Sequence, residues 1–548
     1  MYAILDGYKE LTDFSVWLAT LPIVLSLATA AFLMLLGNYP KFQARIAISM
    51  NGLILILCFL LMQHVERHGV LVVKMGSWPA PFGIIFAVDN FAALFSLFAA
   101  IAGLALTAFA VDTSDGSEKR FGFLSLIMLL MAGVHGAFLT GDIFNLYVWF
   151  EVMVIASFGL LILGGRHHQL DGAIKYTFLN LLATSFFLVS VGLLYGLTGS
   201  LNFADLSLKL ADMNNDPILL IIAFLMITAF LMKSAVFPLG MWLPASYHTP
   251  KIIVSAIMAG LLTKVGLYAL IRTSFVIFPT IFIDYQGLFI TLGALTLLIG
   301  AIGALAHSDI RRVGAYLVIA GVGTILLGLA MNSPQSLSGA LFYATQSILL
   351  MSAFFMCIAL IRVSGGSYDA HRITSLYRRD PALSILFFML MLAIAGLPPF
   401  SGLWAKMQLI ESAVASHSYF ALGALLIGSF LIIIALGRLW LHLFWGERLP
   451  LAILHRPSKN RLCTYYKKGR PFIYALSLAS LSLGFGLFPD VVMKRTDAAV
   501  KDIMQMEAYQ FRVLHNNGTP LYTPLQTEQP VSSEASSSNP INAGESHE

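Results

Sequence analysis

IIAFLMITAFLMKSAVFPLGMWLPASYHTPKIIVSAIMAGLLTKVGLYALIRTS, residues 221–274, consists of two apolar runs joined by the polar segment 246–251. Each run carries one lysine, Lys233 in the first and Lys264 in the second, among residues that partition into hydrocarbon. A charged side chain at the centre of a bilayer costs about 3 kcal/mol on insertion scales. Two lysines at such positions therefore indicate a function inside a membrane.

Pro238 interrupts the first of these runs, five residues after Lys233. A proline within a helix has no amide proton to donate, and it frees the carbonyl four residues earlier, here that of Ser234. A broken helix beside a buried ionisable group is typical of ion pathways through membranes. We therefore expect residues 231–244 to line such a pathway.

The composition excludes a soluble globular protein, because 58% of the 548 residues are hydrophobic and only 11% are charged, whereas soluble domains carry about 25% charged residues.

The three cysteines stand singly, so no disulfide framework, metal centre or iron–sulfur site is indicated. We expect no cofactor and no metal. The formal charge of +5 is not by itself evidence for nucleic acid, and we expect no nucleic-acid partner.

Apolar stretches that can cross the hydrocarbon, each of about 20 residues, predict about 14 helices. They begin near Ser15, Ile46, Ala87, Phe121, Ile143, Ala173, Ile218, Ile252, Gly287, Val313, Ser338, Leu383, Tyr419 and Phe472. The fold class is therefore an all-α polytopic membrane protein.

The lysines and arginines predict the orientation. With the N-terminus outside, the inward loops hold 20 of the 33 basic residues and the outward segments hold nine, among them Arg272. The remaining four, Lys233, Lys264, Lys406 and Arg438, fall within spans. This excess of positive charge inside fits an even number of helices with both termini outside.

A second broken segment resembles the first. In AIAGLPPFSGLWAK, residues 393–406, Pro398 and Pro399 interrupt a span and Lys406 follows them. Interrupted spans at matching positions of two halves indicate inverted repeats with the ion path at their interface, here two five-helix repeats that contain broken helices. The predicted segments are helices 1–3 (1–120, with a short extended part at 71–86), the first repeat of helices 4–8 (121–276), the second repeat of helices 9–13 (286–446), a basic inner loop with helix 14 (447–490), an interfacial amphipathic helix (491–515) and a disordered tail (516–548).

Four ionisable residues are predicted to share one depth in the membrane. Glu151 lies about nine residues into its span, roughly 14 Å from the outer face, and Lys264 lies roughly 20 Å from the inner face. Lys406 is about ten residues from the outer end of its span, and Lys233 belongs to the broken helix. A row of buried amines and a carboxylate suits proton transfer, because moving an opposite charge nearer or farther changes proton affinity.

Other interpretations of these residues stay open. A Glu151–Lys233 pair acts either as a gate or as a static ion pair that only holds helices together. Lys264 or Lys406 alone can be a packing or snorkelling lysine.

Three polar residues are weaker candidates for proton uptake or relay. His307 can deliver protons from the inner face or simply end a helix, and His248, in the loop 246–251, reads more readily as a solvated side chain. Gln346, within an apolar span, can orient a water molecule.

NLYVWFEVMVIASFGLL (145–161), LMKSAVFPLGMWLPASYHTP (231–250), VSAIMAGLLTKVGLYAL (254–270) and AGLPPFSGLWAKMQLIE (395–411) resemble the antiporter-like subunits shared by respiratory complex I and the Mrp-type multisubunit cation/proton antiporters. The segments 76–90 and 497–510 look like the D-type branch of the Mrp subunits. The resemblance implies a bundle of 14 helices with inverted five-helix repeats, in a hetero-oligomeric complex of a bacterial plasma membrane.

Matched position by position, the resemblance assigns roles to four residues. Glu151 and Lys233 correspond to the family's proton-gating pair, Lys264 to its relay lysine and Lys406 to the lysine of the second half. The chain departs from the family pattern at Gln346 and Met351, where a histidine and a lysine are usual, so the link between Lys264 and Lys406 is depleted. Lys251 replaces a usual proline and makes the inner mouth more basic.

The leading hypothesis is a proton-translocating subunit of a multisubunit Na⁺ or K⁺/proton antiporter, a transporter subunit and not an enzyme. Its expected partners are the other subunits, membrane lipids, protons and Na⁺ or K⁺. One alternative is a proton-pumping subunit of a complex I-like NADH:quinone oxidoreductase or of a membrane-bound hydrogenase. A second alternative is a structural subunit that does not conduct.

Overall fold

The computed structural model describes residues 14–78, 80–114, 118–119, 121–211, 213, 216–446 and 469–515. The predicted disordered tail and most of the basic inner loop lie outside the described residues.

Helices account for nearly all of the described chain. They are α2 (Phe14–Leu35), α3 (Pro40–His68), α4 (Asn90–Thr113), α6 (Phe123–Leu139), α7 (Ile143–Ile162), α8 (His167–Thr198), α9 (Phe203–Ala211), α10 (Pro217–Lys233), α11 (Trp242–Tyr247), α12 (Ile252–Ile257), α13 (Thr263–Val276), α14 (Pro279–Asp284), α15 (Gln286–Ala306), α16 (Ile310–Ala330), α17 (Pro334–Gly365), α18 (Leu376–Arg379), α19 (Pro381–Ala395), α20 (Ser401–Ala415), α21 (Tyr419–Trp440), α23 (Arg470–Leu487), α24 (Asp490–Met504) and α25 (Met506–His515). The 3₁₀-helices η1 (Met75–Ser77) and η3 (Ala370–Arg372) and the π-helices η2 (Met258–Leu262) and η4 (Leu441–Trp445) complete the helical elements. The strands are β1 (Leu71–Lys74) and β2 (Ile85–Val88).

The protein is a multi-pass membrane protein. Among the described residues, eleven helices are long and apolar enough to cross a bilayer, and three further apolar helices, α6, α10 and α19, are shorter. The number of crossings, about 14 from the sequence, and the inverted repeats stay predictions.

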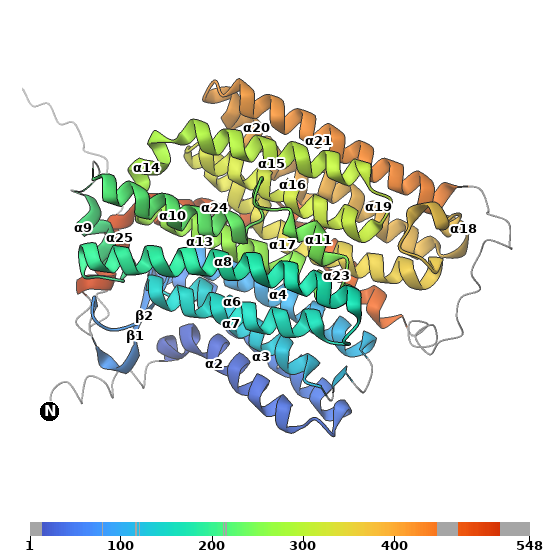
Figure 1. Cartoon of the computed structure of the whole chain (residues 1–548), viewed down its shortest axis with the longest axis horizontal. Coiled ribbons are helices and arrows are strands. Elements are labelled where there is room, and N and C mark those ends of the chain that lie inside the picture. The colour runs from blue at the N-terminus through green and yellow to red at the C-terminus, as the bar shows by residue number, and fades with distance from the viewer. Residues whose placement is uncertain are drawn as a thin grey trace, which may run out of the picture.

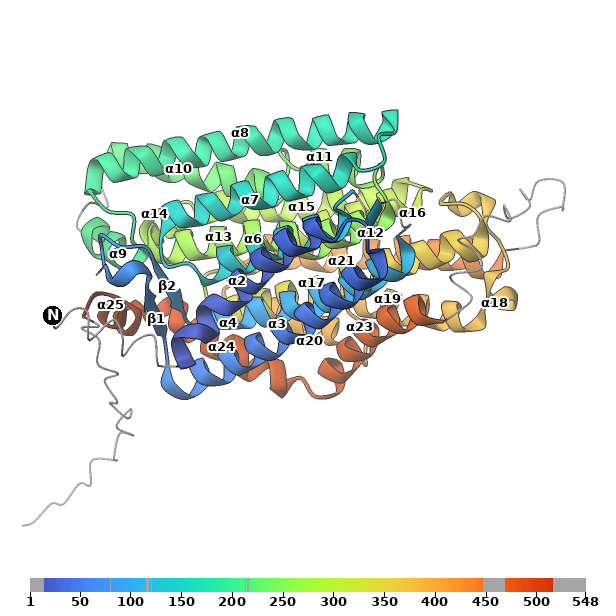
Figure 2. The same cartoon turned by 90° about the horizontal axis from the view of Figure 1, so that it is seen from below.

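The helices run side by side along the long axis of the molecule (Figure 1). At one end, here called the hairpin end, lie β1, β2, α9 and α25, and α18 lies at the opposite end, here called the α18 end (Figures 1 and 2). In Figure 1, α2 and α3 form one edge of the bundle, α21 forms the opposite edge, and α17 lies near the middle. The topology predicted from the basic residues makes the hairpin end the outer one.

β1 and β2 pair antiparallel, with Leu71 opposite Val88 and Lys74 opposite Ile85. The hairpin lies within the stretch that the sequence predicts as extended, and it holds the start of α7, because the Gly141 amide donates to the Ile85 carbonyl at 3.0 Å. It thereby fixes the hairpin end of the helix that carries Glu151.

The three prolines predicted to break helices lie at two real interruptions. α10 ends at Lys233 and α11 begins at Trp242, with Pro238 between them. α19 ends at Ala395 and α20 begins at Ser401, with Pro398 and Pro399 between them. A third interruption, the π-turn η2, falls directly before Lys264 and was not predicted.

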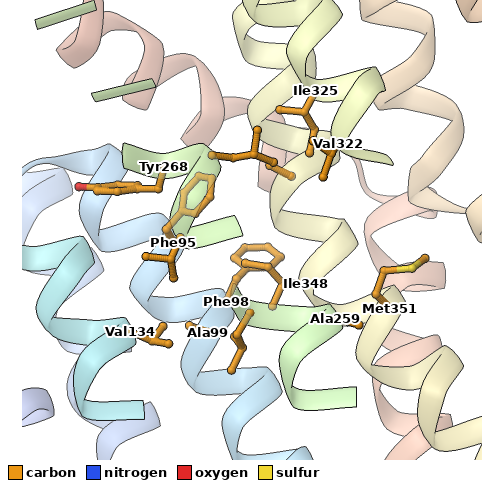
Figure 3. Packing of buried hydrophobic residues seen from close by; sticks show 14 of the residues in the cluster. Phe95, Phe98, Ala99, Val134, Ala259, Tyr268, Val322, Ile325, Ile348 and Met351 are labelled. Atoms are coloured by element: carbon orange, nitrogen blue, oxygen red, sulfur yellow. The ribbon is translucent and has the colours of Figure 1, made fainter. Parts of the chain in front are cut away.

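The interior is formed by α12, η2, α13, α16 and α17, whose most apolar windows are 78–94% buried inside the protein, whereas those of α8 and α21 are only 39% buried. The outer helices therefore leave large apolar side chains for lipid or for other subunits. Figure 3 shows the packing of this core, where Phe95, Tyr268, Ile348 and Met351 belong to one apolar cluster.

The amphipathic segment at the C-terminal side forms two helices, α24 and α25. The buried face of α24, with Val492, Thr496 and Val500, packs on α4 and α17. Ser338 of α17 contacts Thr496 at 2.9 Å and donates to Asp497 at 2.6 Å. Its predicted position along the membrane interface stays a prediction.

Candidate functional site: a row of buried lysines

Lys233 is the last residue of α10 and is 5% exposed. Its Nζ atom has no hydrogen-bond partner among the described residues and lies 4.8 Å from the centroid of the Phe150 ring. Two features favour an ammonium there, namely the negative end of the α10 dipole and the negative face of the ring.

The helix is interrupted after Lys233. Ala235 adopts a positive φ of 62°, and the indole Nε1 of Trp242 donates to the Met232 carbonyl at 3.0 Å. The Phe237 amide donates to Thr296 Oγ1 at 3.1 Å. Side chains thus satisfy part of the backbone that the break leaves without helical partners, as non-helical backbone within a membrane requires.

Glu151 lies on α7 next to Phe150 and is half-buried. Within the described part of the chain, no ion pair joins Glu151 to Lys233. The predicted pair is therefore open, with the ammonium of Lys233 held against the aromatic ring instead.

Lys264 lies in α13, directly after η2, and is 1% exposed. Its Nζ donates to the Ala259 carbonyl at 2.8 Å. A π-turn leaves a carbonyl without its usual helical partner, and the lysine supplies the missing donor. Sequence reasoning missed this interruption because the segment contains no proline.

The first two lysines are brought close through a glycine contact. A Cβ at Gly266 of α13 would lie 2.7 Å from Ser234 Oγ and 3.2 Å from the backbone carbon of Lys233. The helix of Lys264 therefore packs directly on the end of α10, and only a glycine permits this approach.

Lys406 repeats this arrangement in the second half. It is 6% exposed, and its Nζ donates to the carbonyl of Ala395, the last residue of α19, at 2.7 Å. The ammonium therefore caps the C-terminal end of the second broken helix. All three lysines thus lie at interruptions of helices.

The link between Lys264 and Lys406 runs past α17 and is largely apolar. Met351, which replaces the family's usual lysine, lies beside Ala259 of η2 (Figure 3). Polar groups resume at Gln346, whose Oε1 accepts from Ser401 Oγ at 2.6 Å, and Ser401 contacts Ser482 at 2.8 Å. The two serines were not predicted.

His248 and His307 both lie at the α18 end. His248 Nδ1 contacts the Pro244 carbonyl at 2.9 Å, and its Nε2 lies 3.3 Å from Arg312 Nη2. Burial lowers the pKa of His248, and Arg312 lowers it further, against the opposing effect of the Pro244 carbonyl. The predicted solvated side chain is thus half-buried, as a neutral acceptor for arginine.

His307 ends α15. Its Nδ1 contacts the Gly303 carbonyl at 2.9 Å, its ring stacks on Tyr316, and its carbonyl accepts from Arg438 Nη2 at 2.9 Å. The helix-end interpretation matches these contacts, and the half-exposed ring also leaves room for proton exchange with water.

The prediction that Arg272 belongs to an outward loop is wrong. Arg272 lies within α13, is 2% exposed and forms a bidentate pair with Asp89, with Nη2 donating at 2.8 Å to Oδ1. A charge count along the chain cannot reveal a partner 183 residues away.

Three primary amines at helix interruptions and one carboxylate make up the site. An amine in such a place can exist in both forms, because burial favours the neutral amine whereas a helix-end carbonyl favours the ammonium. No group of three or more histidine, cysteine, aspartate or glutamate residues that could hold a metal occurs in the described part of the chain.

Residues 140–432 match the model of the family described as NADH:quinone oxidoreductase/Mrp antiporter, TM. The chain is 35% identical over 494 residues to the D-type subunit of the Na(+)/H(+) antiporter of Bacillus subtilis (strain 168), an alignment that covers 90% of this chain and 98% of the relative.

Solved structures have the same fold. A chain of the Mrp complex from Dietzia sp. DQ12-45-1b superposes with a TM-score of 0.84 at 26% identity, covering 92% of this chain and 100% of that one. A chain of the membrane-bound sulfane sulfur reductase, an archaeal respiratory membrane complex, gives a TM-score of 0.81 at 25% identity, with coverages of 90% and 99%.

Proposed function

The chain belongs to the NADH:quinone oxidoreductase/Mrp antiporter family of membrane proteins, and from this premise we propose that protons move through it along Glu151, Lys233 and Lys264. The protein is a subunit of a multisubunit Na⁺/H⁺ antiporter and assembles with the other subunits of that complex. It is a transporter subunit and not an enzyme. Proton movement through this chain is coupled to cation movement elsewhere in the complex.

The observation that carries the proposal is the shared placement of the lysines. Lys264 and Lys406 donate to carbonyls at helix interruptions, and Lys233 ends the helix α10. When one of these ammonium groups releases its proton, a neutral amine remains, so no unpaired cation is buried. The amine can regain the proton because the nearby carbonyl or the helix dipole favours the ammonium.

Glu151 completes the gate in this proposal. The open geometry, with Lys233 on the Phe150 ring, is the state in which the two charges are apart. Movement of Lys233 toward the carboxylate raises its hold on the proton, and return to the ring lowers it.

The second half joins the row through Gln346 and Ser401. The amide and hydroxyl provide a donor and an acceptor in sequence toward α20, which carries Lys406. Met351 interrupts the polar contacts on the Lys264 side, so we propose that water bridges this gap.

His307 and His248 provide proton uptake at the α18 end.

The protein lies in a bacterial plasma membrane in this proposal, with both termini outside. The excess of basic residues in the predicted inward loops supports this orientation. With Cys463 replaced by serine, a membrane-impermeant maleimide applied to right-side-out vesicles should label Lys501→Cys on α24 and spare Lys175→Cys on α8, two exposed positions. The reverse pattern contradicts the orientation.

The test uses inside-out vesicles that contain the whole complex. Collapse of a respiration-driven pH gradient on addition of Na⁺ or K⁺ is measured for the wild type, Glu151→Gln and Lys233→Met at equal assembly. We expect at least about a tenfold loss of exchange in both variants, which corresponds to about 1.4 kcal/mol or more in the transport barrier.

Lys175→Met is the matched control, because Lys175 is an exposed lysine that pairs only with Asp171 among the described residues. It should exchange like the wild type. Unchanged exchange in Glu151→Gln and Lys233→Met contradicts the proton row and favours a structural subunit. Gradient formation driven by electron transfer through co-purifying redox subunits, without a response to Na⁺ or K⁺, favours the redox-complex alternative, to which the likeness to the sulfane sulfur reductase chain also points.

A further inference from the structure

A second buried charged group lies on the same helix as Lys264 and has no role in the proton row. Arg272 follows Lys264 by eight residues on α13, about 12 Å along the axis toward the hairpin end. Its guanidinium donates to both oxygens of Asp89 at the start of α4, and Asp89 Oδ1 also accepts from the Ala92 amide at 2.8 Å. Both side chains are at most 2% exposed.

Tyr268 fills the turn between Lys264 and Arg272. Its hydroxyl accepts from Arg272 Nη2 at 2.8 Å and donates to the Phe138 carbonyl at 2.7 Å. The single hydroxyl proton is thereby committed to a backbone carbonyl. Tyr268 offers no free proton to a chain that starts at Lys264.

Three phenylalanine rings pack around this tyrosine, and one of them, that of Phe91, also lies 5.0 Å from the Arg272 guanidinium. The rings of Phe91, Phe95 and Phe138 lie 4.4, 5.6 and 4.9 Å from that of Tyr268. Figure 3 shows Tyr268 and Phe95 within the apolar cluster. Water in a pathway needs two to four polar partners, and these rings supply none.

The C-terminal helices cover the arginine at the hairpin end. Asp502 of α24 accepts from the amide and the side chain of Asn90 at 2.9 and 2.8 Å. The ring of Tyr509 on α25 lies 5.8 Å from the Arg272 guanidinium. The contacts hold α24 and α25 over the hairpin end of α13, so the arginine is enclosed on all sides by protein.

We propose that Arg272, held by Asp89 and Tyr268, is an electrostatic seal that keeps protons on Lys264 from leaving toward the hairpin end. A guanidinium keeps its proton under all physiological conditions, and a fixed arginine in a pore is a barrier to protons and cations. Asp89 compensates the buried charge, which makes the barrier tolerable in the core. The proposed seal rests on the proposed proton row and defines where that row ends toward the hairpin end.

The seal predicts a specific defect. When methionine replaces Arg272, the smaller, uncharged side chain lets water reach Tyr268. The Lys264 ammonium then passes one proton to that water and becomes a neutral amine, the water passes one of its protons outward, and Lys264 is reprotonated along the row. The result is proton flow without cation exchange.

The experiment measures this leak in liposomes that contain the whole purified complex. An imposed pH gradient decays in choline buffer free of Na⁺ and K⁺, with tetraphenylphosphonium to compensate charge, and a trapped pH dye records the rate. Arg272→Met should speed the decay several-fold over the wild type at equal assembly. Arg272→Lys keeps the positive charge and should leave the decay slow.

Two further variants keep the test decisive. The double variant Asp89→Asn/Arg272→Met leaves no unpaired buried charge, so it should assemble even where Arg272→Met does not, and it should leak as well. Adding Lys264→Met to either variant should restore the slow decay, because the leak starts at Lys264.

Slow decay in both Arg272→Met and the double variant overturns the seal. A fast leak that persists with Lys264→Met overturns its link to the row. The proposed function fails separately, when Glu151→Gln and Lys233→Met exchange normally. If Arg272→Met does not leak protons while Glu151→Gln has lost cation exchange, the proposed seal is overturned and the proposed proton row is supported.

Discussion

Two of the three buried lysines of the row bind a carbonyl at a helix interruption, whereas Lys233, at the end of α10, has no hydrogen-bond partner for its Nζ among the described residues. Lys264 binds Ala259 in the π-turn, and Lys406 binds Ala395 at the end of α19. A buried ammonium without such a partner costs several kcal/mol. The interruptions of the helices therefore provide backbone partners for the buried ammonium groups of Lys264 and Lys406.

His248 should make the inner mouth sensitive to acid. Its pKa in the folded protein is lowered, first by burial and then by Arg312. The folded state therefore binds the proton less well than the unfolded chain, and stability rises with pH. The contribution of His248 to the free energy of unfolding is fully present above the ordinary imidazole pKa of about 6.5. It is lost as the pH falls through the lowered pKa of His248 in the folded protein.

Amide hydrogen exchange of residues 244–252 checks this expectation. After correction for intrinsic exchange, protection should be lower at about pH 5 than at about pH 7.5, and His248→Gln should remove the difference. Equal pH dependence in the wild type and the variant contradicts it.

At the residue scale, the burial of the three lysines could be predicted from the sequence, whereas the burial of Arg272 with its partner could not. Lys233, Lys264 and Lys406 stand out because each interrupts an apolar run. Arg272 was misplaced because its partner, Asp89, lies at the start of α4, far away in the sequence, and three-dimensional proximity leaves no local pattern in one chain.

At the scale of elements, close packing of η2 on α17 positions Lys264. A Cβ on Gly260 would collide with Ser352 Oγ and would lie 3.2 Å from the Ile348 carbonyl. Gly260→Ala should therefore push the π-turn away from α17, at an overpacking cost of about 1–3 kcal/mol. We expect a lower unfolding temperature of the complex and slower cation-driven exchange.

Ser352→Gly provides the matched rescue. It removes the hydroxyl that the new methyl group would meet, so Gly260→Ala/Ser352→Gly should regain part of the unfolding temperature and of the exchange rate. A single variant Gly260→Ala that behaves like the wild type in both measurements contradicts the positioning role of this contact.

Proline made two of the three interruptions predictable. Pro238, Pro398 and Pro399 remove amide donors, so the breaks after α10 and α19 follow from the sequence. The π-turn η2 follows from the packing of Gly260 against α17, and α24 follows an amphipathic pattern that does not say whether its apolar face meets lipid or protein. Elements whose shape depends on a neighbour were the ones that sequence reasoning left incomplete.

At the scale of the whole molecule, the proposed row of lysines passes from one helix to the next across the bundle, whereas each helix runs along the long axis of the molecule. The apolar windows of α12–α13 and of α16 are the most buried, at 94% each, and α17 packs beside them; α10 contacts α13 and α20 contacts α17, so both bring their lysines to this interior. At the hairpin end, α24 packs against α13 and α4, and β1, β2 and α25 lie at the same end of the molecule (Figure 2).

Replacement of Lys233 by arginine distinguishes a residue that carries protons from one that only carries charge. Arginine keeps a positive charge at the end of α10 but does not release its proton. The whole complex is reconstituted in liposomes, a Na⁺ gradient is imposed, and the internal pH is followed for wild type, Lys233→Arg and Lys233→Met. We predict that both variants lose cation-driven proton movement while they assemble normally. Lys233→Arg that exchanges at the wild-type rate contradicts a proton path through Lys233.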